Sequence, residues 1–375
     1  MKQLFVILTI VLTLSSCGGK SKPVSVDASG HPIALRYATN LSLTQYDNYV
    51  VATLCNPWDT TKVLHTYVLV DKNEPLPSEL PQGTVVRTPI GKAVVYSSVH
   101  CSLLQQLGAV GSIAGVCDLK YIKLQEIQDR CRDGKIVDTG DGMSPDMEKI
   151  IDLHPDAILL SPFENSGGYG RIEKLNVPII ECADYMETSP LGRAEWMRFY
   201  GLLFGRQQEA DTLFTQVEKE YVALRTLAAT GTPVPTVISE LKNSSAWYVP
   251  GGKSTTAGFY ADAGGHYLFA DDTHSGSVPL AFETVVDKGQ NADLWLIKYN
   301  QATDKTYREL EKEYAPYTGF RAFKEQTIYG CNTGKVSLYE DYPFRPEWLL
   351  KDLIKIFHPS LLMHYDLKYF TKLAN

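Results

Sequence analysis

Hydrophobic residues change their spacing along the chain, and the spacing predicts the elements. From residue 93 onward, short apolar runs typical of buried strands alternate with segments of helical periodicity. The predicted strands cover residues 94–96, 113–116, 157–160, 177–181, 237–239, 294–297 and 335–338, and the predicted helices between them include 100–107 and 143–153. Because strands that alternate with helices assemble into parallel sheets, this part of the chain predicts an α/β fold.

One long helical region divides the α/β part in two. Residues 191–204 and 207–228 have helical periodicity, and Gly201 and Gly205 are the interruptions. In the second segment the apolar stripe consists of Ala210, Leu213, Phe214, Val217, Tyr221 and Leu224. A helix over residues 207–228 would be roughly 33 Å long at 1.5 Å per residue. We therefore predict two α/β lobes joined by a stiff helical spine.

Residues 33–90 precede this alternation and differ from it. Residues 49–54 and 66–70 are rich in β-branched and aromatic side chains, and Pro57 and the prolines of residues 75–81 separate such runs. This pattern predicts an N-terminal β-rich extension over residues 33–91, formed by a pair of hairpins that packs on the first lobe.

The first 17 residues predict export and lipidation. Lys2 is followed by an apolar run over residues 4–14, which is too short for a bilayer span of roughly 20 residues. This run is typical of a signal-peptide core. Residues 14–17, Leu-Ser-Ser-Cys, resemble the lipobox of bacterial lipoproteins, which implies that Cys17 carries the lipid. We expect residues 18–32 to be a tether and the lipid to be the membrane attachment.

Composition excludes some partners. A chain of 375 residues with 44% hydrophobic and 21% charged residues is long enough for two lobes and normal for a soluble globular protein. The net charge of −7, without a basic run, argues against nucleic acid as a partner. The six cysteines besides Cys17 contain no C-x-x-C spacing, so they do not predict a zinc knuckle or a thioredoxin-like site, and their disulfide pairing stays open.

The two predicted lobes share a repeated segment. Residues 147–160 and 282–297 each contain an acidic residue near a helix start, two branched apolar residues, a second acid, a turn and a buried strand. Glu148 and Glu283 occupy equivalent positions of the repeat. A bilobed protein that holds a ligand between two related halves accounts for such a duplication.

From about residue 92 to the C-terminus, the chain resembles the helical-spine (class III) substrate-binding proteins of ABC importers, which take cobalamin, ferric siderophores or haem. The resemblance implies lobes over residues 92–187 and 231–375, a spine over 188–230, and a periplasmic monomer without catalysis or a resident cofactor. It further implies that Glu148 and Glu283 dock on a permease dimer through charge-assisted pairs. Each glutamate is also a favourable acid in a first helical turn, which is the alternative.

In parallel α/β layers, ligands bind outside the carboxyl ends of the strands, so the loops there are the candidate ligand site. The resemblance and these loops together indicate aromatic and polar side chains around a cobalt or iron chelate. The candidates are Tyr96, Ser98, His100, Phe163, Glu164, Tyr169, Trp247, Tyr248, Asp341, Tyr342 and Arg345. The spacing of Asp341 and Arg345 resembles the corresponding loop of cobalamin-binding members.

Eight histidines raise the alternative of a bare zinc or manganese ion. Such a site needs three or four convergent His, Asp or Glu ligands, and His100 and His274 are the histidines on suitable loops. His100 is also a candidate axial ligand of haem. Adjacent tyrosines, expected of a phenolate site for bare ferric iron, do not occur.

Other functional classes are less well supported. Residues 251–255, Gly-Gly-Lys-Ser-Thr, look like the end of a phosphate-binding loop, but Trp247 stands where a Walker A motif requires glycine. We find no G-x-S-x-G elbow, H-E-x-x-H motif or dinucleotide fingerprint, so an enzyme is not expected. A surface glycan-binding lipoprotein stays an alternative for an aromatic-rich chain, and it would require an all-β architecture.

Overall fold

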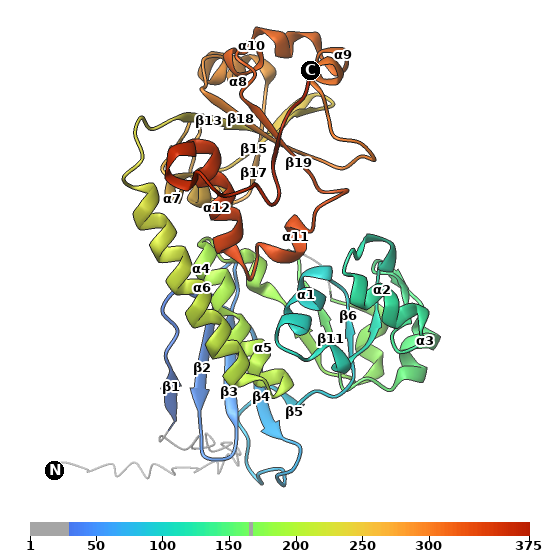
Figure 1. Cartoon of the computed structure of the whole chain (residues 1–375). Coiled ribbons are helices and arrows are strands. Elements are labelled where there is room, and N and C mark those ends of the chain that lie inside the picture. Colours follow the sequence, from blue (N-terminus) through green and yellow to red (C-terminus); the bar gives the residue numbers. More distant parts are fainter. Residues whose placement is uncertain (1–29, 165–167) are drawn as a thin grey trace, which may run out of the picture.

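The computed structural model describes residues 30–164 and 168–375. It consists of an N-terminal β-sheet, a first α/β lobe, a run of helices and a second α/β lobe (Figure 1). The predicted fold class, two β/α lobes joined by one long helix, is confirmed. The lipidation candidate Cys17 lies outside the described residues. Within the part that the structure describes, no helix is both long and apolar enough to cross a membrane.

The N-terminal extension is one five-stranded sheet in the order β1-β2-β3-β4-β5. Its strands are β1 (His31–Ile33), β2 (Leu41–Gln45), β3 (Val50–Cys55), β4 (Val63–Asp71) and β5 (Thr84–Thr88). Strands β1 to β4 pair antiparallel, and β5 runs parallel to β4. The β-rich prediction is confirmed, but the strands form one continuous sheet instead of a pair of hairpins.

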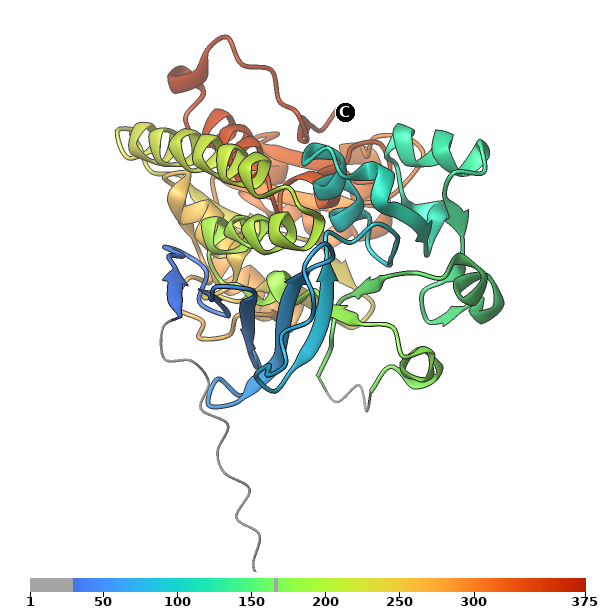
Figure 2. The same ribbon diagram turned by 90° about the horizontal axis from the view of Figure 1, so that it is seen from below.

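This sheet packs on both the helical run and the first lobe (Figure 2). The ring of Tyr67 lies 6.0 Å from the ring of Phe199 in the spine. The hydroxyl of Tyr67 donates to the carbonyl of Ile179 in the first lobe at 2.9 Å. The extension is therefore part of the same folded body as the two lobes.

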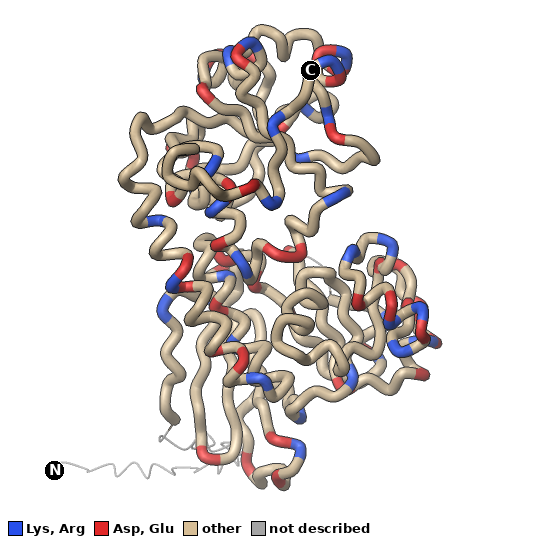
Figure 3. The backbone as a smooth tube through the Cα atoms, in the orientation of Figure 1, with Lys and Arg blue, Asp and Glu red and all other residues tan. Residues whose placement is uncertain are grey.

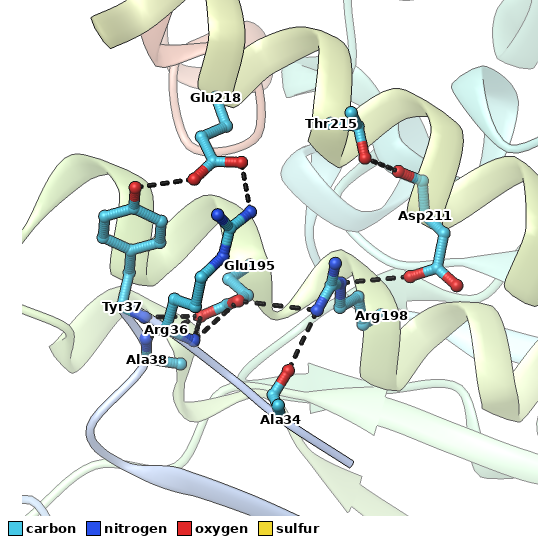
Figure 4. Close-up of polar contacts among 9 residues, drawn as sticks. All are labelled: Ala34, Arg36, Tyr37, Ala38, Glu195, Arg198, Asp211, Thr215 and Glu218. Carbon is cyan, nitrogen blue, oxygen red and sulfur yellow. Dashed lines mark hydrogen bonds and ion pairs between the residues drawn. The ribbon is translucent and has the colours of Figure 1, made fainter.

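Two buried glutamates, Glu187 and Glu195, hold the chain between β1 and β2 against the helical run, and Figure 4 shows the contacts of Glu195. The carboxylate of Glu195 accepts hydrogen bonds from the backbone N–H groups of Arg36, Tyr37 and Ala38 at 2.8 to 3.0 Å. Glu187 similarly accepts from the backbone N–H groups of residues 39 and 40. Each carboxylate thus satisfies backbone donors that the loop itself leaves unpaired.

The first lobe is built on a parallel sheet in the order β12-β11-β6-β7-β8. The strands are β6 (Ala93–Val95), β7 (Ile113–Val116), β8 (Val137–Asp138), β11 (Ala157–Leu160) and β12 (Ile179–Glu181). The helices are α1 (Ser98–Gln106), η1 (Val110–Ser112), η2 (Leu119–Tyr121), α2 (Gln125–Arg132), α3 (Met147–Leu153), η3 (Gly170–Leu175) and η4 (Ala183–Met186). Each predicted strand of this lobe is present.

One boundary in this lobe differs from the prediction. The helix predicted over residues 143–153 begins at Met147, because the Asp146 side chain accepts from the N–H groups of Glu148 and Lys149 and caps the helix. The preceding Ser144–Pro145 forms β10, which pairs with β9 (Gly140–Asp141). A side-chain cap, not the proline, decides where the helix starts.

The spine consists of three helices, α4 (Pro190–Glu195), α5 (Met197–Phe204) and α6 (Gln207–Ala228). Helix α6 has the predicted bounds and runs along one edge of the molecule from the level of the first lobe to the second (Figure 1). Gly205, with φ of 64°, ends α5. At Gly201 a Cβ atom would lie 2.7 Å from the Cβ of Ala210, so glycine permits α5 and α6 to approach closely.

The second lobe has a five-stranded sheet in the order β16-β13-β18-β19-β20 and a three-stranded sheet in the order β14-β15-β17. The strands are β13 (Thr236–Ser239), β14 (Lys242–Asn243), β15 (Ala246–Pro250), β16 (His266–Tyr267), β17 (Ser277–Leu280), β18 (Leu294–Tyr299), β19 (Ile328–Asn332) and β20 (Thr371–Lys372). The helices are α7 (Thr255–Asp262), α8 (Phe282–Gly289), α9 (Tyr307–Glu313), η5 (Ala315–Gly319), α10 (Arg321–Lys324), α11 (Leu338–Asp341), α12 (Pro346–Phe357) and η6 (Pro359–Leu362).

The strand predicted over residues 335–338 is wrong. These residues form a turn and the start of α11, and the corresponding strand is β19. Gly330 interrupts the apolar pattern of β19, which hides the strand in the sequence. A Cβ atom at Gly330 would meet the ring of Tyr299 at 2.7 Å, so the glycine makes room for a neighbouring side chain.

Candidate functional site

A cavity of about 610 Å³ lies where the first lobe, the spine and the second lobe meet. We call it the cleft. Its lining residues are Tyr185, Arg193, Glu240, Leu241, Lys242, Asn243, Tyr248, Pro250, Ser254, Thr255, Thr256, Ser275, Gly276, Ser277, Lys298 and Tyr342. The volume falls in the range of about 300–1,000 Å³ that is usual for sites of small organic ligands.

The parallel sheet of the second lobe brings Glu240 and Lys298 together in the cleft. Glu240 directly follows β13, and Lys298 lies near the carboxyl end of the neighbouring strand β18. Glu240 has a left-handed backbone with φ of 66°, and its carbonyl accepts from the Trp295 indole at 2.8 Å. The Lys298 ammonium pairs with the Glu240 carboxylate. Burial lowers the pKa of Lys298, but Glu240 outweighs burial and raises it, so this lysine is charged and locally neutralised.

Two further cations line the cleft. Arg193, on α4, contacts the carboxylate of Asp184 through Nε at 3.2 Å, and its guanidinium lies 5.5 Å from the centre of the Tyr342 ring. Lys242, on β14, lies over the ring of Tyr314 at 5.1 Å. Among the described residues, no carboxylate forms an ion pair with Lys242. The cleft therefore carries more positive than negative charge, although the chain as a whole has a net charge of −7.

The start of α7 contributes hydroxyl groups. Residues 254–256 line the cleft, and the Ser254 side chain caps α7 by accepting from the N–H of Ala257 at 3.2 Å. The glycines before this helix serve packing: a Cβ atom would lie 2.2 Å from the His274 carbonyl at Gly251 and 2.3 Å from the Ala270 carbonyl at Gly252. The Gly-Gly-Lys-Ser-Thr segment is therefore a tightly packed turn that enters a helix at the cleft.

Aromatic walls complete the cleft, and two of them were among the predicted ligand residues. Tyr248 is 48% exposed, and Tyr342 lies beside Arg193. Tyr185 comes from the first lobe, and its hydroxyl donates to the carbonyl of Pro162 at 2.6 Å. Tyrosine rings provide flat apolar surface with a polar edge, which suits a large planar or chelated ligand.

Trp247 was predicted in the cleft, and the structure contradicts this. The side chain is fully buried, its indole donates to the carbonyl of Ser239 at 3.0 Å, and its ring lies 5.5 Å from that of Trp295. Successive residues of a strand point to opposite faces, so Tyr248 faces the cleft and Trp247 faces the core.

His100 was predicted as a ligand contact and as a candidate axial ligand of haem, and its burial contradicts both. The residue is 3% exposed and lies inside the first lobe. Its Nε2 lies 2.8 Å from Oδ1 of Asp184 and 3.0 Å from the hydroxyl of Tyr200. The ring is therefore engaged by side chains far along the chain and does not line the cleft.

Asp341 and Arg345 face a different part of the molecule from the one predicted. The Asp341 carboxylate accepts from the Tyr369 hydroxyl at 3.0 Å. Arg345 pairs with Glu347 at 2.6 Å, and its guanidinium lies 3.9 Å from the Trp348 ring centre. Asp341 thus contacts the C-terminal segment, and Arg345 contacts the first turn of α12.

The remaining predicted ligand residues are not among the lining residues of the cleft. Tyr96 and Ser98 are half-buried, whereas Phe163 and Glu164 are exposed. Tyr169 donates its hydroxyl to Glu181 at 2.5 Å and lines a separate cavity of about 460 Å³ with His65. The sequence thus identified two lining tyrosines and missed Arg193, Lys242, Lys298 and Tyr185.

Another cavity, of about 680 Å³, lies between α6, α12 and the C-terminal segment. Its walls include Leu224 and Leu227 of α6 and Trp348 of α12. This cavity has no lining residue from the first lobe. The cleft is the better candidate site because polar groups of both lobes and the spine converge on it.

The structure also bears on the alternatives. Among residues 30–164 and 168–375, no group of three or more His, Cys, Asp or Glu side chains could hold a metal ion. His274 pairs instead with Asp272 at 3.0 Å on the surface. The parallel sheets of both lobes contradict the all-β architecture that a glycan-binding lipoprotein would require. The six cysteines of the described chain are free thiols.

Glu148 and Glu283 have matching environments. Glu148 lies in the first turn of α3 and Glu283 in the first turn of α8, one helix in each lobe, and both side chains are exposed. Figure 3 shows that acidic and basic residues are otherwise mixed over both lobes. Docking through the two glutamates stays a prediction.

A two-lobed α/β protein with a helical spine and a polar cleft at the lobe junction has the class III architecture of binding proteins. Residues 93–333 match the model of the periplasmic binding protein family, and the chain belongs to this family. The N-terminal sheet lies outside the matched region.

Relatives and solved structures agree with this assignment. An uncharacterized lipoprotein of Methanocaldococcus jannaschii is 26% identical over 368 residues, which covers 89% of this chain and 85% of the relative. A periplasmic binding protein from Veillonella parvula superposes with a TM-score of 0.60 at 17% identity, covering 73% of this chain and 93% of the other. The apo form of a periplasmic haem-binding protein from Roseiflexus gives a TM-score of 0.56 at 22% identity, covering 72% and 99%. These superpositions show a shared fold.

Proposed function

We propose that the chain is the substrate-binding lipoprotein of an ABC importer, which captures a metal chelate (corrinoid, ferric siderophore or haem) and delivers it to the permease. The observation that carries the proposal is the cleft of about 610 Å³, where tyrosines and cations of both lobes and the spine converge. Haem-binding and Fe³⁺-hydroxamate transport proteins are among the structures of similar fold, which supports a chelate as cargo.

Capture requires a shaped surface and no chemistry on the ligand. Tyr185, Tyr248 and Tyr342 would pack against the organic part of a chelate, while the hydroxyl groups at the start of α7 would accept or donate hydrogen bonds at its edge. Because α6 spans the molecule as one uninterrupted helix, the lobes would move little when the ligand binds. Binding would stabilise the folded protein by mass action.

Delivery would use the exposed surfaces of the two lobes. Glu148 and Glu283 would pair with basic side chains of a permease dimer, one glutamate for each half. The lipid on Cys17 would keep the protein at the membrane, and the similar lipoprotein of Methanocaldococcus jannaschii supports this cell-envelope location. We further propose that the protein acts as a monomer.

A binding screen tests the proposal. Protein that begins after Cys17 is titrated with cobalamin, haem and several ferric siderophores, and binding is followed by calorimetry and absorption spectra. We expect one of these chelates to bind saturably with a dissociation constant in the micromolar range or below. Zn²⁺ is the control ion. Binding of Zn²⁺ without binding of any chelate would favour the bare-metal alternative instead.

A further inference from the structure

A buried polar network joins the first lobe to the spine directly behind the cleft. Oδ1 of Asp184 lies 2.8 Å from Nε2 of His100 and accepts from the hydroxyl of Tyr200 at 2.9 Å. Oδ2 of the same carboxylate accepts from Nε of Arg193 at 3.2 Å. Asp184 and Tyr200 are fully buried and His100 is 3% exposed, so water does not screen these contacts.

This network contains two cations for one carboxylate. Burial lowers the pKa of His100, but Cys182 and Asp184 raise it to about 10, so the imidazole is protonated at neutral pH. Burial raises the pKa of Asp184, but His100 and Arg193 outweigh burial and lower it. In the described part of the chain, no other carboxylate forms an ion pair with His100 or Arg193. His100 and Arg193 thus share the single carboxylate of Asp184.

Arg193 is the member of the network that reaches the cleft. Its side chain is 12% exposed and lines the cavity. Within residues 30–164 and 168–375, its Nε donates to the Asp184 carboxylate and its Nη1 donates to the Tyr342 hydroxyl at 3.4 Å. The contact with Tyr342 is long for a hydrogen bond. The rest of the guanidinium edge is open to a ligand.

The second lobe also touches this network. Tyr342 lies against Arg193, and the ring of Phe344 lies 6.2 Å from the ring of His100 and 5.9 Å from that of Tyr200. Phe344 is fully buried there. A ligand that binds the guanidinium would therefore meet residues of both lobes and the spine at one point.

We propose that Arg193 selects chelates that carry a negatively charged group, and that His100 and Asp184 are positioning residues that hold its guanidinium toward the cleft. This inference rests on the proposed chelate-binding function. Asp184 alone would neutralise Arg193, whereas the second cation, His100, leaves the guanidinium charge available to the ligand. A carboxylate or phenolate oxygen would replace the long Tyr342 contact with a charge-assisted hydrogen bond.

The test compares chelates that differ in charge and share a skeleton. The pairs are haem with its dimethyl ester, cobalamin monocarboxylic acid with cobalamin, and a carboxylated ferric trihydroxamate with its neutral parent. For the skeleton that binds, we expect the wild-type protein to favour the anionic member. Arg193→Gln should reduce this preference at least tenfold with little change in the affinity for the neutral member. Arg193→Lys should restore part of the preference, and Lys219→Gln, at an exposed position of α6 outside the cleft, should leave both constants unchanged.

His100→Gln separates positioning from simple structural support. The groups that face His100 are Cys182, Asp184 and Tyr200, with Phe344 as the apolar neighbour. In the wild-type protein the anionic preference should be constant from pH 6 to 8 and fall as pH rises toward 10, because His100 loses its proton there. In His100→Gln the preference should be lower and this pH dependence should disappear, while circular dichroism confirms folding.

Two results would overturn the inference. If Arg193→Gln lowered the affinity for both members of a pair equally, the residue would support the cleft structurally and would not discriminate between anionic and neutral chelates. A wild-type preference for the neutral member would exclude an anion-selective role. If no member of any pair binds the wild-type protein, the proposed function fails and the role of Arg193 fails with it.

Discussion

Trp247 and Tyr248 are neighbours on β15, but their side chains have opposite surroundings. Trp247 packs against Trp295 in the core of the second lobe, and Tyr248 is half exposed at the cleft. The alternation along a strand separates a residue that stabilises the fold from one that is available to a ligand. Sequence alone gives two adjacent aromatic residues and does not say which face is buried.

The pair supplies a matched test at this scale. Trp247→Ala should destabilise the protein by about 4 kcal/mol, because it leaves a large cavity in the core. Tyr248→Ala should change the unfolding free energy by less than about 0.5 kcal/mol and weaken chelate binding roughly tenfold, since it removes aromatic surface from the cleft wall. Urea denaturation and calorimetric titration measure the two effects. If Tyr248→Ala destabilised the fold and Trp247→Ala weakened chelate binding instead, β15 would have the opposite register.

Glu347 is a buried titratable residue outside the cleft. It is 1% exposed, and burial raises its pKa from 4.5 to about 7 even though Arg345 lowers it. The folded protein therefore binds a proton that the unfolded chain releases at lower pH. The corresponding stability is fully present below about pH 4.5 and is lost as pH rises through about 7.

Glu347→Gln should flatten this pH dependence. Between pH 5 and 7 the unfolding free energy of the wild-type protein should fall more steeply with pH than that of the variant. The two slopes should differ by at most the amount that corresponds to one bound proton. Denaturation at several pH values measures the difference. Glu209→Gln is the control, because Glu209 is exposed and does not line the cavity beside Glu347. A similar flattening in both variants would contradict the assignment to Glu347.

At the scale of elements, the N-terminal sheet is attached to the spine by charge as well as by packing. The buried carboxylate of Glu195 on α4 accepts from backbone N–H groups of residues 36–38, and Arg36 and Tyr37 also contact Glu218 of α6 (Figure 4). The partners are about 160 to 180 residues apart in sequence. No local pattern predicts this attachment, because an acidic residue in a helix usually faces solvent.

Replacing Glu195 tests the attachment. Glu195→Gln should lower the unfolding free energy by about 3 kcal/mol, since the neutral amide cannot accept from every backbone donor and leaves a buried N–H unpaired. Hydrogen exchange of residues 34–40 should accelerate by more than that of the second lobe. Glu209→Gln, an exposed acid on α6, should stay within about 0.5 kcal/mol of the wild-type protein. Equal stabilities of the two variants would contradict the role of Glu195.

At the scale of the whole molecule, two exposed glutamates lie on separate lobes that a helical spine connects. Ligand capture and permease docking would use different surfaces, since neither Glu148 nor Glu283 lines the cleft. The two activities should therefore be separable by mutation.

The double variant Glu148→Ala, Glu283→Ala should bind its chelate as the wild-type protein does and fail to support transport. Binding is measured by titration, and uptake is measured in vesicles that contain the permease and the lipidated protein. Glu311→Ala, on α9 of the second lobe, serves as a control for the loss of one exposed acid and should leave both activities unchanged. Loss of chelate binding in the double variant would contradict the docking assignment.

Hydrophobic periodicity by itself determined the elements of this protein. The bounds of α6, β7 and β11 follow from local apolar patterns, because a helix or strand must bury one face wherever it packs. The α/β alternation and the repeat around Glu148 and Glu283 indicated two lobes and a spine. Where a glycine or a side-chain cap overrides the pattern, as at Gly330 and Asp146, the predicted element is misplaced.

The cleft was decided by tertiary structure. Arg193 appears in the sequence as one charged residue of a helical region, and only the folded chain brings it to Asp184 and to Tyr342, which is 149 residues away. His100, which sequence reasoning placed at the ligand, is buried because Asp184, 84 residues later, supplies a charged partner. Burial and pairing depend on contacts between distant segments, and these contacts determine which polar side chains remain available to bind.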